Sequence, residues 1–203
     1  MADTQGGEQA SVSIRRATPA DALGIARVHV RSWREAYGHV FSPFLLGRLS
    51  VESRAERWRR MIIAGAEVWV AELVAQPVES AAHAVRAAPA KASALKAAPT
   101  AKAAPGAVSR IVGWASAGPA RDEDGPVQRE LHGIYVLRDH HGTGAAQRLL
   151  DAALGNSPAF LWVLVDNPRA RAFYRRNGFV PDGTTKVDTF GGEPAAELRM
   201  VRR

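Results

Sequence analysis

The stretch ELHGIYVLRDHHGTGAAQRLLDAAL, from Glu130 to Leu154, decides the fold of this chain. Its first part is rich in β-branched and apolar residues and predicts a strand, whereas its last part carries leucine and alanine at helical spacing. The turn between them holds Gly142 and Gly144. Small residues let a ligand approach the backbone, and the first amides of a helix have no partner inside that helix. A strand, a glycine turn and a helix N-terminus together predict a site for a phosphate or pyrophosphate.

The glycine turn fits two classes of cofactor site. As GTGAAQ, over 142–147, it is a degraded dinucleotide fingerprint, and Asp166 follows roughly 20 residues later, where a ribose-binding acid is expected. This interpretation predicts an oxidoreductase. A dinucleotide-binding fold has two mononucleotide-binding halves, however, and only one β-α-β unit surrounds the turn. As HHGTGAA, over 140–146, the turn matches a Q/R-x-x-G-x-G/A pattern in which His141 takes the first place. The residues downstream favour this second interpretation.

The downstream stretch FLWVLVDNPRARAFYRRNGFV, over 160–180, predicts a strand, an Asp-Asn-Pro helix start, a short helix and an aromatic strand start. LHGIYVLRDHHGTGAAQRLL and VDNPRARAFYRRNGF together resemble the acetyl-CoA-binding core of the GNAT-superfamily N-acetyltransferases. The resemblance is strongest over 111–202, and the N-terminal helices fit the family more loosely.

The resemblance implies an α/β fold with a mixed sheet (α+β). This is the GNAT-type acyl-CoA N-acyltransferase fold, with a central β-α-β cofactor cradle and a splayed strand pair. It also implies an enzyme that moves an acetyl group from acetyl-CoA to a primary amine by direct attack. The chain has no cysteine, which agrees with transfer that needs no cysteine acyl-enzyme. The acceptor is expected to be a small-molecule or peptide amine.

The family resemblance also assigns the cofactor-binding residues. The pantetheine arm is expected to bond to the backbone of Ile134, Tyr135 and Val136, and the Val136 amide to stabilise the oxyanion. Asn167 is expected either to cap the following helix or to bond to a pantetheine amide. The pyrophosphate is expected to rest on the backbone amides of His141, Gly142, Thr143, Gly144, Ala145 and Ala146. His141 departs from the family's usual Gln or Arg, which puts only a side-chain contact in doubt.

Two residues are predicted to carry the chemistry. Glu130 begins the strand that precedes the glycine turn. A Glu at this position resembles the general base in some branches of the family, so Glu130 is the expected base, with His132 or water as alternatives. Strict alternation places Glu130, His132, Ile134 and Val136 on one face of the strand. Tyr174 matches the family tyrosine that lies near the cofactor sulfur and protonates the leaving thiolate.

The composition narrows the remaining possibilities. The chain has 203 residues, no cysteine and a net charge of +7, so a disulfide framework and a thiolate metal site are excluded. The basic surface suits a solvated exterior, an anionic cofactor or nucleic acid, but no nucleic-acid reading helix or aromatic platform is recognisable. No metal is expected, because no carboxylate completes a ligand spacing with the histidines. The absence of a leader or an apolar span favours a cytoplasmic protein.

The chain is expected to have a disordered N-terminus over 1–10 and a single acetyltransferase domain over 11–203. An Ala/Pro/Lys-rich hairpin insertion over 75–108 interrupts that domain. The expected order is β-α-α-α-β, the insertion, and then β-β-α-β-α-β-β. The N-terminal helices are expected to line the acceptor pocket, with Trp33, Glu35 and Tyr37, together with His29 and Phe41, as possible substrate contacts. The protein is expected to be a monomer or a homodimer.

We predict that deleting residues 78–107 and joining the flanking strands by a short turn preserves folding and acetyl-CoA affinity. The deleted segment has almost no large apolar residue, so it contributes little to a core. Circular dichroism and calorimetry with acetyl-CoA check this expectation. Loss of cofactor binding in a folded deletion variant would contradict it.

Overall fold

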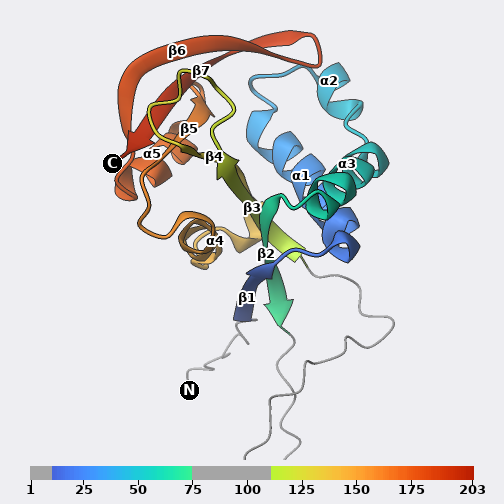
Figure 1. Ribbon diagram of the computed structural model, residues 1–203. Helices are drawn as coiled ribbons and strands as arrows, with labels where there is room; N and C mark the ends of the chain where they lie inside the picture. The colour runs from blue at the N-terminus through green and yellow to red at the C-terminus, as the bar shows by residue number, and fades with distance from the viewer. Residues whose placement is uncertain (1–10, 75–110) are drawn as a thin grey trace, which may run out of the picture.

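The structure is a computed structural model that describes residues 11–74 and 111–203 (Figure 1). The predicted N-terminal tail, 1–10, and the predicted insertion, 75–108, lie outside the described residues. The described elements follow the order that the sequence predicts.

The N-terminal part consists of one strand and three helices whose starts the sequence encodes. Ser42 accepts a hydrogen bond from the amide of Leu45 at 3.1 Å, and Ser50 accepts one from the amide of Ser53 at 3.1 Å. These serines are N-caps, because each satisfies an amide that its helix leaves free. The elements are β1 (Ser11–Arg16), the 3₁₀ turn η1 (Pro19–Asp21), α1 (Ala22–Tyr37), α2 (Pro43–Gly47) and α3 (Val51–Ile63).

The rest of the described chain forms the sheet and two further helices. Its elements are β2 (Glu67–Val74), β3 (Ile111–Pro119), β4 (Arg129–Val136), the 3₁₀ turn η2 (Arg138–His140), α4 (Ala145–Leu154), β5 (Ala159–Leu164), α5 (Pro168–Arg176), β6 (Val180–Phe190) and β7 (Glu193–Arg202). The described strands lie in the order β1-β2-β3-β4-β5-β7-β6. Every neighbouring pair is antiparallel except β4 and β5, which are parallel.

The parallel pair is open along most of its length. Only Glu130 and Phe160 are aligned between β4 and β5, at the start of both strands. Beyond that point β4 keeps its pairing with β3, and β5 keeps its pairing with β7. The predicted splayed strand pair is therefore present, and the edges of β4 and β5 that face each other have no ladder partner there.

A β-bulge in β4 changes which residues share a face. Leu131 is aligned with Ala117 and Gly133 with Ser116, so His132 is an extra residue on β4. Glu130 therefore faces the same side as Gly133 and Tyr135. The prediction that Glu130 shares a face with Ile134 and Val136 is wrong, because the bulge shifts the alternation by one residue.

The two faces of the sheet carry separate apolar clusters. Figure 1 shows α1 and α3 on one side of β2–β4 and α4 on the other. Leu149 and Leu150 of α4 are fully buried in the cluster that also holds Leu131, Ile134 and Val136. The opposite cluster joins α1 and α3 to Trp114 and Tyr135. The bulge thus sends the side chains at 134 and 136 to the α4 face and that of Tyr135 to the α1 face.

The long β6–β7 hairpin arches over toward α2 (Figure 1). Glu193, at the start of β7, accepts a hydrogen bond from the amide of Ser42 at 2.9 Å and a second from the Ser42 hydroxyl.

None of the helices in the described ranges combines the length and the apolar character that crossing a bilayer requires.

Candidate active site

A cavity of about 1480 Å³ opens beside the splay between β4 and β5. Its walls come from α1, α2 and α3, from the β4–α4 turn, from α5 and from the inner face of β5, β6 and β7. Most of the predicted site residues line it, including Trp33, Tyr37, Tyr135, Asn167 and Tyr174. The fold therefore brings residues far apart in sequence to one cavity.

The end of β4 offers backbone groups to this cavity. The Leu137 amide donates to the Val112 carbonyl at 2.9 Å, so residue 137 faces β3. Because successive residues of a strand point their amides to opposite edges, the amide and carbonyl of Val136 face the open splay. His141 Nε2 donates to that carbonyl at 2.9 Å, which ties the glycine turn to the strand end. The Val136 amide is thus left as a donor aimed into the splay.

The predicted glycine turn between β4 and α4 is present, and its glycines have left-handed backbone conformations. Gly142 and Gly144 both have φ of 81°, a left-handed conformation that side chains rarely adopt. A Cβ at either position would meet no heavy atom within 4 Å, so the backbone here borders open space. No hydrogen bond joins the amides of residues 142–146 to any group in the described part of the chain. Free amides at a helix start and open space over glycine fit a pyrophosphate.

Helix α5 places two predicted residues at the cavity. Asn167 Oδ1 accepts a hydrogen bond from the Ala170 amide at 3.0 Å, which makes Asn167 the N-cap of α5. Tyr174 is only 6% exposed and packs edge-on against Phe173 and Phe179. Burial, followed by the nearby Tyr37 phenol, raises the pKa of Tyr174, so its hydroxyl keeps its proton at neutral pH. No hydrogen bond links that hydroxyl to the described residues, and it is therefore available to a ligand.

Aromatic rings form the α1 side of the cavity. The Tyr37 and Tyr135 hydroxyls lie 3.3 Å apart, and burial raises the pKa of both phenols. Trp33 stacks on Phe41 with ring centroids 5.8 Å apart. His29 stacks on Tyr135 with centroids 5.5 Å apart. These rings give an apolar wall beside the strand residue that precedes Val136.

Glu35, a predicted substrate contact, is engaged by other protein groups. Its Oε1 accepts from Arg31 at 2.7 Å, and its Oε2 accepts from the Arg138 amide at 3.0 Å. The Glu35 carbonyl also accepts from the Arg138 guanidinium at 2.9 Å. Glu35 therefore joins α1 to the β4–α4 turn.

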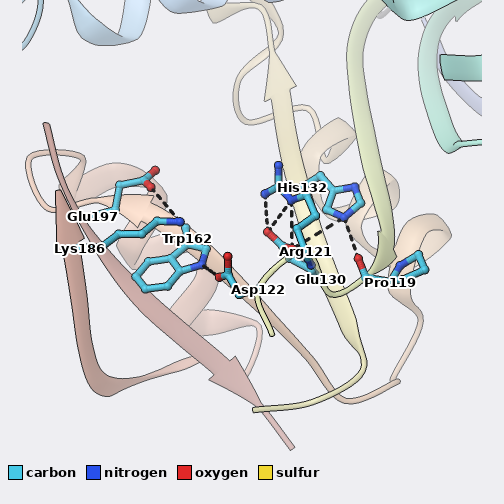
Figure 2. A network of polar contacts seen from close by, with 8 residues as sticks. All are labelled: Pro119, Arg121, Asp122, Glu130, His132, Trp162, Lys186 and Glu197. Atoms are coloured by element: carbon cyan, nitrogen blue, oxygen red, sulfur yellow. Dashed lines mark hydrogen bonds and ion pairs between the residues drawn. The ribbon is translucent and has the colours of Figure 1, made fainter. Parts of the chain in front are cut away.

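The carboxylate of Glu130 binds Arg121, and Glu130 is not among the residues that line the cavity. Its carboxylate accepts from the Arg121 amide at 2.9 Å and from the Arg121 guanidinium, and the residue is 0% exposed (Figure 2). The bulged His132 lines the cavity, and its Nε2 contacts the Pro119 carbonyl at 3.2 Å. The expectation that Glu130 is the general base finds no support in this geometry, since its oxygens already bind Arg121.

A second glutamate, which the sequence analysis missed, lines the cavity. Glu197 of β7 lies 3.8 Å from Lys186, whose ammonium sits 4.1 Å from the centroid of the Trp162 ring (Figure 2). Trp162 in turn donates to Asp122 at 2.5 Å. Burial is the main factor that raises the pKa of Glu197. The only sign of this residue in the sequence was a glutamate between apolar residues of the last predicted strand, AAELRMVR.

Neither alternative function finds support. A dinucleotide-binding oxidoreductase needs a mostly parallel sheet, whereas the described sheet has one parallel strand pair. The backbone carbonyl of Asp166, the acid expected to bind ribose, accepts a hydrogen bond from His39 Nε2 at 2.9 Å, and its carboxylate has no hydrogen bond to the described residues.

Comparison with known proteins gives a direct match. A model of the acetyltransferase (GNAT) domain matches residues 102–181. An uncharacterized N-acetyltransferase of Bacillus subtilis (strain 168) is 28% identical over 163 residues, which cover 77% of this chain and 74% of the relative. A probable N-acetyltransferase of Mycobacterium tuberculosis is 25% identical over 184 residues, which cover 86% of this chain and 83% of the relative.

The fold agrees with this match. The structure of YncA, a putative acetyltransferase from Salmonella typhimurium with its cofactor acetyl-CoA, superposes with a TM-score of 0.57 at 16% identity. The superposition covers 95% of this chain and 94% of that one. With the splayed strands and the glycine turn in place, the domain match over 102–181 and the two relatives support a GNAT-superfamily N-acetyltransferase.

Proposed function

We propose that this N-acetyltransferase moves an acetyl group from acetyl-CoA to a primary amine of a small molecule or peptide by direct attack, in the cytoplasm. The observation that carries the proposal is the Val136 amide facing the open splay beside a cavity that also holds Tyr174. Acetyl-CoA supplies the acetyl group as an activated thioester. The residues of the chain supply binding, orientation and proton transfer.

The backbone provides the binding and the electrostatic stabilisation. The amides of residues 142–146 bind the pyrophosphate, aided by the positive end of the α4 dipole. The open edge of β4, at Ile134, Tyr135 and Val136, binds the amide-rich arm of the cofactor. The Val136 amide donates to the oxygen on which charge develops during transfer. Its orientation is fixed because His141 holds the carbonyl of the same residue.

A base must take a proton from the acceptor, because an amine of pKa near ~10 is mostly protonated at neutral pH. Of Glu130 and Glu197, only Glu197 lines the cavity, and its carboxylate is paired with Lys186 at 3.8 Å rather than bound by a guanidinium. We assign the base to Glu197. Glu130 is a positioning residue that holds Arg121 at the cavity wall.

Tyr174 is assigned as the acid. Its phenol is protonated, borders the cavity and lies on the helix that follows the splayed β5. A phenol donates readily to a thiolate whose conjugate acid has a pKa near ~8.5.

We predict that Gly144→Glu abolishes acetyl-CoA binding. The substitution puts bulk and negative charge where the pyrophosphate rests, and it forces a side chain into a left-handed conformation. Calorimetry measures the affinity, and Gly47→Ala, at a position open to solvent away from the turn, serves as the control. Unchanged affinity in folded Gly144→Glu protein would remove the pyrophosphate from this turn.

We predict that Tyr174→Phe lowers turnover by roughly 10- to 10⁴-fold, with little change in acetyl-CoA affinity or thermal stability. The substitution keeps the packed ring and deletes only the proton donor. Stopped-flow kinetics and calorimetry separate the two effects. Wild-type turnover under conditions in which chemistry limits the rate would make Tyr174 a packing residue, and parallel losses in binding and turnover would make it a cofactor-positioning residue.

We predict that Glu197→Gln lowers kcat/KM by roughly 10²-fold or more and removes the acid limb of its pH profile. A base works when deprotonated, so the wild-type rate falls as pH drops through the raised pKa of Glu197. Glu130→Gln should instead lower the thermal midpoint, because it breaks a buried carboxylate–guanidinium pair, and should keep the acid limb. The reverse pattern in the two variants would return the base to Glu130.

A further inference from the structure

The acceptor side of the cavity contains an arginine without an acidic partner. Arg54, on α3, is half-buried and lines the cavity. In the described ranges no carboxylate lies within ion-pair distance of its guanidinium. Arg121, by comparison, lines the same cavity but is paired with Glu130. Cations are seldom buried without a partner, because leaving water is costly unless an anion offsets the loss.

The protein groups around Arg54 leave most of its donors unused. Its NH1 lies 3.2 Å from His29 Nε2, while His29 Nδ1 accepts from Trp58 Nε1 at 3.3 Å. Burial, with the Arg54 and Arg57 cations, lowers the pKa of His29 to about 3, so the imidazole is neutral. A neutral imidazole has one donor and one acceptor nitrogen, and it cannot accept from both neighbours. The Arg54 guanidinium has five N–H donors, and His29 can accept at most one of them.

Arg54 is nevertheless held in place and lies near the reacting position. Its guanidinium sits 5.3 Å from the centroid of the Trp33 ring, a cation–π contact that fixes its direction. His29 lies between it and Tyr135, the residue next to Val136. An acceptor whose amine reaches the Val136 end of β4 thus passes along the aromatic wall toward Arg54.

The charges at this end of the cavity are all positive. The lining residues from α2, α3 and their connection include three arginines and no acid, and these cations are Arg48, Arg54 and Arg57. The carboxylates that line the cavity come from other elements. They are Glu35 of α1, Asp122 before β4, Asp166 after β5, Asp188 of β6 and Glu197 of β7. The charged lining residues of α2, α3 and their connection are therefore all cations, whereas the proposed base, Glu197, lies on β7. A ligand with an amine and an oxyanion matches this polarity.

We propose that the acceptor amine carries an anionic group, a carboxylate or comparable oxyanion a few bonds from the nitrogen, and that Arg54 binds this group. The inference rests on the proposed acetyl transfer to an amine and narrows its substrate class. The planar guanidinium donates two parallel N–H groups to the oxyanion, the geometry in which arginine binds carboxylates best. The amine is then directed toward the splay and Glu197.

The test compares acceptors that differ only in the anion. The pairs are phenylalanine with phenethylamine, methionine with methylthiopropylamine, β-alanine with ethylamine, γ-aminobutyrate with propylamine and aminomethylphosphonate with methylamine. Release of coenzyme A is followed with a thiol reagent, to which the cysteine-free chain contributes no background. The wild-type enzyme should show the higher kcat/KM for the anionic member of every pair that reacts.

Variants of the arginine complete the test. Arg54→Gln should lower kcat/KM for the anionic acceptors by roughly 10- to 100-fold through KM, with little effect on their neutral partners or on acetyl-CoA affinity. Arg54→Lys should recover part of the loss, because it restores the charge but not the planar fork. Arg60→Gln removes the same charge from the same helix outside the cavity and should behave as wild type.

Three results would overturn the inference: a preference for the amines without an anion, equal losses for both members of a pair in Arg54→Gln, or no transfer to any acceptor by protein that binds acetyl-CoA. Failure to bind acetyl-CoA would instead reject the proposed transferase function itself.

Discussion

The separation of β4 from β5 is the constraint on which the rest of the site depends. Two parallel strands that begin in register at Glu130 and Phe160 then part, and each keeps its other neighbour. The unpaired edge of β4 would be costly in a closed interior, because buried backbone amides need partners. Here that edge borders a cavity, so the groups that the sheet leaves free can bind an amide-rich ligand. The hydrogen-bonding groups of the site are thus backbone groups of β4 that have no partner strand.

Two groups keep the splay in its position. At its closed end, the buried Glu130 binds the amide and guanidinium of Arg121, which fixes the loop before β4. At its open end, His141 binds the Val136 carbonyl and so couples the glycine turn to the strand. Both tethers act on β4, and the second joins the glycine turn directly to Val136. His141, at the position where the family usually has Gln or Arg, thus has a structural role in joining the turn to β4.

The order of the elements and the glycine turn before α4 could be predicted from sequence because they depend on local signals. A glycine turn and serine or asparagine caps act over a few residues, and the structure has them at Gly144, Ser42, Ser50 and Asn167. The roles of Glu130 and Glu197 could not be predicted in this way. The bulge at His132 shifts the face of Glu130, and the burial of Glu197 comes from strands that meet only in the folded sheet. Arg54 was missed for the same reason, since the lack of a partner is a property of packing and not of helix α3 alone.

The contact between the β6–β7 hairpin and α2 has a consequence for both elements. Glu193 holds both the amide and the hydroxyl of Ser42, and that hydroxyl is also the cap of a helix only five residues long. Moving the hairpin away from this corner therefore also loosens the first turn of α2, and with it Leu45 and the rest of the apolar cluster beneath. The tip of the hairpin and the start of α2 are therefore coupled through one side chain, because the Ser42 hydroxyl that caps the helix also binds the hairpin.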